Sequence, residues 1–65
     1  MTYLEILFWA RKGIQADIDH YRAMQEKALQ GQAHDLARFA QISIDALDVK
    51  RATLDEIEEI HNRKD

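Results

Sequence analysis

Gly31 lies near the middle of the chain, between two stretches of nearly equal length that carry helical apolar periodicity, and no proline interrupts either stretch. A helix often ends at a glycine in the left-handed backbone conformation, because a Cβ strains that geometry. We therefore expect Gly31 to form the hinge and to adopt the left-handed backbone conformation. The sequence predicts an all-α fold, a single antiparallel helical hairpin over residues 1–65, with helices at about 2–30 and 34–62 and a turn at about 31–33.

Polar residues near the helix ends support these limits. Thr2 and Glu5 have the spacing of a capping box, in which each side chain bonds the other residue's backbone N–H. Asp35 falls in the first turn of the second helix, where its charge complements the helix dipole. Thr53 and Glu56 repeat the capping-box spacing and would permit a break into a third helix. Because neither glycine nor proline follows Gln32, the unbroken helix is favoured.

Each helix has one broad apolar face when residues are placed at about 100° per position. The first face, widened by Ile6 and Met24, comprises Tyr3, Leu4, Leu7, Ala10, Ile14, Ile18, Tyr21, Ala28 and Leu29. The second, flanked by Ile42, Val49 and Ile60, comprises Leu36, Phe39, Ala40, Ala46, Leu47, Leu54 and Ile57. Both faces are wider than a two-helix seam needs, and a chain of 65 residues without cysteine has few other means of stabilisation. We therefore expect a homodimeric four-helix bundle.

Folding the helices about Gly31 predicts which side chains share a layer. The pairs are Ala28 with Leu36, Ile18 with Ala46 and Leu47, Ile14 with Lys50, Leu7 with Ile57, and Leu4 with Ile60 and His61. The same register places Tyr21 within hydrogen-bonding range of Ser43, and Arg11 within reach of Asp55. Such polar residues are either satisfied locally at the edge of the seam or fix its register, and the first interpretation is favoured.

A carboxylate three residues before a histidine occurs twice, as Asp17 with His20 and Glu58 with His61. This spacing on paired helices is typical of di-iron bundles, so a metal-binding four-helix bundle is one alternative. The first helix lacks the further inward-facing glutamates of such sites, and solvated surface pairs are favoured. Since no motif for catalysis or cofactor binding is present either, we expect a non-enzymatic protein with no catalytic, cofactor or metal site.

Phe8 and Trp9 are the best candidates for an interaction site. Trp9 falls roughly opposite the centre of the apolar face and Phe8 lies at its edge, so a single hairpin would leave a large aromatic area in water. Gly13, in the helix interior, favours close approach of another helix at that flank. Two interpretations of Trp9 are equally favoured: a dimer partner covers it, or a further protein does.

The charge balance indicates which partners are expected. A net charge of −3 with interleaved signs supplies no basic field for a phosphate backbone, so nucleic-acid binding is not expected. The size and hairpin plan nevertheless resemble those of the small dimeric four-helix-bundle regulators of plasmid replication that bind RNA. This resemblance is architectural, and it implies a nucleic-acid-binding regulator as a second alternative, acting through Arg11, Lys12, Arg22 and Lys27.

The expected location is cytoplasmic, because the N-terminal apolar segment is too short for a membrane span and lacks the features of a signal peptide. These observations together predict a small protein–protein interaction or regulatory module that acts as a helical-hairpin dimer.

Overall fold

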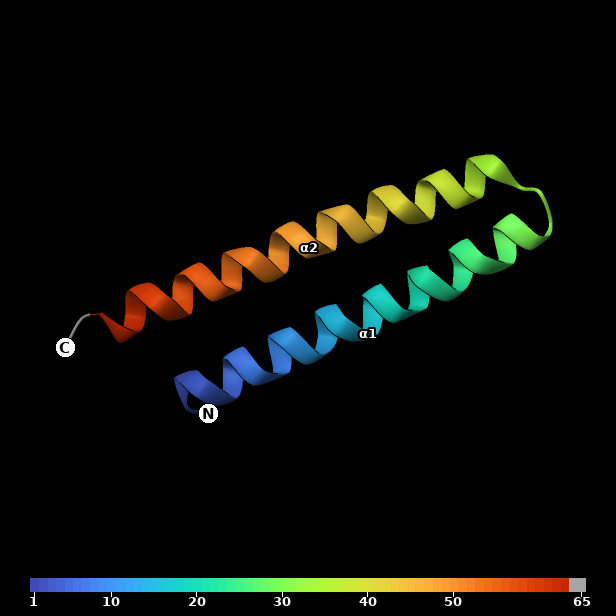
Figure 1. The fold of residues 1–65 in the computed structure, drawn as a ribbon. Coiled ribbons are helices and arrows are strands. Elements are labelled where there is room, and N and C mark those ends of the chain that lie inside the picture. The colour runs from blue at the N-terminus through green and yellow to red at the C-terminus, as the bar shows by residue number, and fades with distance from the viewer. Residues whose placement is uncertain (64–65) are drawn as a thin grey trace.

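The computed structural model describes residues 1–63, and these form two helices, α1 (Tyr3–Gln30) and α2 (His34–Asn62). The helices run antiparallel, side by side, with the hinge at one end and the start of α1 beside the end of α2 at the other, which we call the open end (Figure 1). The expected all-helical hairpin is confirmed.

The start of α1 is capped by half of the expected capping box. The Thr2 hydroxyl accepts a hydrogen bond from the Glu5 backbone N–H at 3.2 Å and lies 3.2 Å from the Glu5 carboxylate, to which it donates. At the start of α2, no side chain caps the helix, although Asp35 accepts from the Leu36 N–H at 2.9 Å. Thr53 donates to the Val49 carbonyl at 2.9 Å, and α2 continues through it unbroken, as expected.

The hinge corrects one expectation about Gly31. Its φ is −88°, whereas Gln32 has the left-handed φ of 57°. The Ala33 N–H bonds the Ala28 carbonyl at 2.8 Å and the Gln32 N–H bonds the Leu29 carbonyl at 3.1 Å. This is the Schellman pattern, in which the left-handed residue is the one after the cap. Gly31 is therefore the cap itself.

The seam between the helices follows a heptad-like spacing of alternating three and four residues. On α1 the seam positions are Leu7, Arg11, Ile14, Ile18, Tyr21, Gln25 and Ala28, and on α2 they are Ala37, Ala40, Ile44, Leu47, Arg51, Leu54 and Glu58. All are buried or half-buried. At the centre Ile18, Ile44 and Leu47 form the core, with Ile14 and Tyr21 packed against them.

Several residues expected in the core are exposed instead. Leu36 and Phe39 on α2 are 53% and 52% exposed, and Ala46 is exposed as well. Leu4 and Leu29 on α1 also face solvent. For α2 the cause is the phase of the helix, because its seam passes through Ala37 and Ile44, two buried residues that the sequence interpretation omitted.

The predicted register is correct near the centre and at the ion pair. Ile18 packs against Leu47, and Arg11 lies 2.5 Å from an Asp55 carboxylate oxygen. The favoured interpretation, that such polar residues are satisfied locally, is confirmed for Ser43, whose hydroxyl donates to the Phe39 carbonyl at 3.0 Å rather than to Tyr21. Tyr21 meets the Phe39 ring edge-on, with 6.0 Å between ring centroids.

Candidate functional site

One side of the hairpin carries most of the exposed apolar surface, and we call it the apolar face. On α2 it consists of Leu36, Phe39, Ile42, Ala46, Val49, Thr53, Ile57 and Ile60, and on α1 of Ile6, Ala10, Gly13 and Met24. Three shallow grooves lie along it, at the hinge, at mid-length and at the open end. Each helix thus buries one stripe of side chains in the seam and leaves a second, apolar stripe uncovered.

The α2 part of the apolar face is large and continuous along the helix. Its five largest side chains between Phe39 and Ile60 are each between 45% and 67% exposed. Monomeric soluble proteins rarely leave contiguous apolar areas of this kind in water. This face is therefore the principal candidate for an interaction surface.

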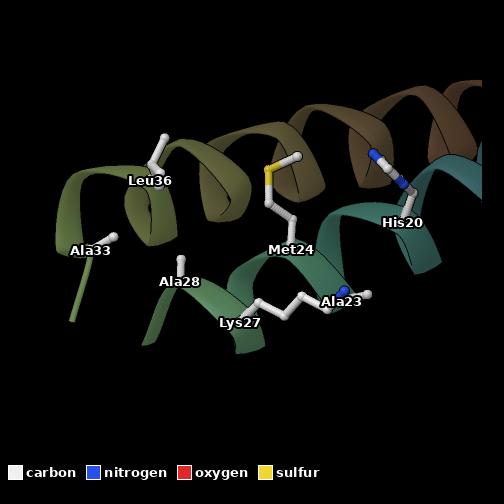
Figure 2. A pocket seen from close by; sticks show the side chains of 7 residues that line it. All are labelled: His20, Ala23, Met24, Lys27, Ala28, Ala33 and Leu36. Carbon is white, nitrogen blue, oxygen red and sulfur yellow. The ribbon is translucent and has the colours of Figure 1, made fainter. Parts of the chain in front are cut away.

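The groove at the hinge shows how the face is built from both helices. His20 and Met24 project from α1, and Leu36 lies across from them on α2 (Figure 2). Ala28 and Ala33 line the groove near the hinge with small side chains. The groove is lined mainly by apolar side chains, and the His20 imidazole and the Lys27 ammonium are its polar groups.

The opposite side of the hairpin is polar and already satisfied by contacts between the helices. Gln25 donates to Gln41 at 2.8 Å, and Arg51 donates to Gln15 at 3.3 Å. Arg11 bridges Asp55 and Glu58 near the open end. Throughout residues 1–63, no buried side-chain nitrogen or oxygen lacks a partner. The two sides of the molecule are thus chemically distinct.

Phe8 and Trp9 form an exposed aromatic pair on α1. They are 57% and 55% exposed, and their rings meet edge-on with 5.5 Å between centroids. The Lys12 ammonium lies 5.4 Å from the Trp9 centroid and 5.6 Å from that of Phe8, within the range of cation–π attraction. Trp9 points away from α2, so the hairpin itself does not cover it.

Gly13 lies one turn after Trp9, on the apolar face. A Cβ added to it would meet no atom within 4 Å. The expected close helix approach at Gly13 therefore does not occur between α1 and α2. The space beside it is open to solvent.

The residues of the alternative metal site are separated and engaged elsewhere. Glu58 pairs with Arg11, and His61 stacks on Tyr3 with 3.8 Å between ring centroids. His20 lies edge-on to Tyr21, in a different layer of the hairpin. Over residues 1–63, no three His, Asp or Glu side chains gather as metal ligands would.

The cations of α1 do not form one basic surface. Arg11 is neutralised by its two carboxylates on the polar side, whereas Lys27 lines the groove at the hinge on the apolar face. Lys12 is held over the two aromatic rings. These three cations therefore lie on different parts of the hairpin surface.

Comparisons of the chain with protein-family models, with curated proteins and with solved structures find no match. Neither α1 nor α2 is long and apolar enough to cross a membrane, within the part of the chain that the structure describes. The case for a function therefore depends on the two surfaces described above.

Proposed function

We propose that the chain is a non-enzymatic protein–protein interaction or regulatory module that acts as a homodimer of helical hairpins. In this dimer the two apolar faces meet and form a four-helix bundle. The observation that carries the proposal is the uncovered apolar stripe along α2, from Phe39 to Ile60. The cysteine-free composition fits a reducing compartment, and a cytoplasmic location is part of the proposal.

The thin core of the hairpin supports this assembly. Ile18 is the one large side chain among residues 1–63 that is completely buried. Covering the exposed half of a large apolar side chain contributes about 1 kcal/mol, so the five large residues on α2 would add about 5 kcal/mol per copy. A chain this small gains much of its stability from such association.

The aromatic pair lies outside this interface and supports the second part of the proposal. Phe8 stays exposed when the apolar faces meet, because it lines a groove with Arg11, Gln15 and Arg51 on the polar side. Trp9 lies at the outer edge of the apolar face, four residues before Gly13, and in this proposal it also stays exposed. Tryptophan is enriched among the residues that dominate binding energy at protein interfaces. We assign Phe8 and Trp9 to contact with another protein, and Gly13 to the dimer interface.

Sedimentation equilibrium at low micromolar concentration tests the dimer. The wild type should sediment as a dimer, and its melting temperature should rise with protein concentration. Ile42→Glu places a charge on the apolar face and should shift the protein to monomer. Leu4→Glu is the matched control, since Leu4 is similarly exposed but lies on the polar side. A wild type that is monomeric and melts independently of concentration would refute self-association.

Trp9→Ala tests the role of the aromatic pair. The variant should keep its helicity and its dimer, and its free energy of unfolding should change by no more than about 1 kcal/mol, since Trp9 is half-exposed. Proteins that copurify with the wild type should be lost. Dissociation of the dimer would place Trp9 in the self-association interface, and outright unfolding would place it in the core.

A further inference from the structure

The apolar stripe of α2 has a symmetric pattern about the midpoint between Val49 and Lys50. Phe39 and Ile60 lie at equal distances on either side of this midpoint, as do Ile42 and Ile57, and as do Ala46 and Thr53. Large side chains therefore occupy both ends of the stripe, and smaller ones occupy its centre.

The flank of α1 on the same face shares this symmetry only in its two large side chains. Ile6 and Met24 are equidistant from Gln15, whereas the counterpart of Gly13 is Asp17 and that of Ala10 is His20. Gln15 bonds Arg51 across the seam at 3.3 Å, so the midpoints on the two helices lie at nearly the same level of the hairpin. The matched large side chains of the two helices thus share nearly one midpoint level.

Such a pattern fits contact between two copies of the same chain. At a two-fold interface, residue i of one copy meets residue j of the other, and j meets i in return. A surface that pairs with itself in this way needs residues that complement each other at equal distances from the axis, and two apolar residues of similar size meet this condition. A heterologous partner imposes no such condition.

We propose that a second copy covers the apolar face in one specific arrangement, with α2 antiparallel to α2 of the other copy and the two hinges at opposite ends. The two-fold axis crosses α2 between Val49 and Lys50. Ile42 of one copy then meets Ile57 of the other, and Phe39 meets Ile60. This inference rests on the proposed dimer and specifies its geometry.

The polar residues of the face distinguish this arrangement from one with both hinges at the same end. With hinges at the same end, α1 packs on α2 of the other copy, and the Asp17 carboxylate lies at the level of Val49 and Lys50. With hinges at opposite ends, α1 meets α1, and Asp17 falls opposite Gly13, where open space remains. The apolar stripes of α2 then meet each other, and no carboxylate is placed against them.

Disulfide cross-linking tests the geometry directly, because the chain contains no cysteine of its own. Val49→Cys lies beside the proposed axis and should form a disulfide-linked dimer under mild oxidation. Ile42→Cys alone should not, since its two copies would lie about 22 Å apart along the bundle, far beyond the about 7 Å that a disulfide spans between Cα atoms. An equal mixture of Ile42→Cys and Ile57→Cys should link one variant to the other.

Two controls separate this inference from the proposed dimer. Leu4→Cys, on the polar side, should stay unlinked, and denaturant should abolish linkage of Val49→Cys. If the wild type sediments as a dimer but Ile42→Cys links to Met24→Cys and not to Ile57→Cys, the hinges lie at the same end and this inference is overturned while the dimer stands. If the wild type sediments as a monomer, both fail, and a different partner covers the face.

Discussion

Gln32 is the one residue among positions 1–63 with a positive φ, and it carries a side chain that this conformation disfavours. We predict that Gln32→Gly raises the free energy of unfolding by up to about 1 kcal/mol, because glycine adopts the left-handed region without strain. Urea unfolding at a fixed protein concentration measures the change.

Gly31→Ala is the informative companion variant. A Cβ on Gly31 would make ordinary contacts with carbonyl oxygens, at 3.6 Å from Lys27 and 3.9 Å from Ala28. At the observed φ of −88° alanine is unstrained, so this change should leave the stability equal or higher by about 0.5 kcal/mol. A marked loss on Gly31→Ala, with no gain on Gln32→Gly, would instead place the left-handed residue at Gly31.

At the scale of the helix, the seam position of Ile44 gives the second prediction. Ile44 is 5% exposed and contacts Ile18 and Leu47. Ile44→Ala should lower the free energy of unfolding by about 2–4 kcal/mol, since it leaves a cavity in the centre of the seam. Leu29→Ala, at a residue 53% exposed on the polar side, should lower it by less than about 1 kcal/mol. Chemical denaturation compares the two, and equal losses would show that the seam phase is different.

The sequence was sufficient to predict the hairpin, because a helical period on both sides of Gly31 admits few other folds. It was not sufficient to predict the phase of α2. Two stripes on that helix have seam-like spacing, one through Leu36 and Phe39 and one through Ala37 and Ile44. Larger side chains favoured the first stripe, whereas the helices pack on the second, where Ala37 and Ala40 are small enough for close approach.

The ambiguity in the phase of α2 also determined how much of the candidate site could be predicted from the sequence. Phe8 and Trp9 lie away from the seam of α1, so their exposure followed from helical angle alone. The apolar face was not recognised, because Leu36 and Phe39 were assigned to the hairpin core. Only tertiary packing distinguishes which of two adjacent stripes is left uncovered.

At the scale of the whole molecule, Lys50 gives the third prediction. It lines the groove at mid-length, and in the proposed dimer its two copies lie beside the two-fold axis and repel each other. Lys50→Met keeps the length of the side chain and removes the charge, so the dimer dissociation constant should fall about tenfold, which corresponds to about 1.4 kcal/mol. Sedimentation equilibrium or isothermal dilution calorimetry measures this dissociation constant.

Lys27→Met provides the comparison, since Lys27 lines the hinge groove far from the axis and its loss should change the constant much less. If Lys50→Met weakens the dimer instead, Lys50 faces an acidic residue of the other copy. That is the result expected for hinges at the same end, where Asp17 would lie opposite Lys50.

The short hinge also bears on how the chain reaches this structure. Only residues 31–33 separate the helices, so the contacts next to the turn, such as Ala33 with Ala28, close the smallest loops and lose the least chain entropy. The stack of Tyr3 on His61 closes nearly the whole chain and forms at the greatest entropic cost. Folding should therefore start at the turn and spread toward the chain ends, and the open end should be the first part to separate on unfolding.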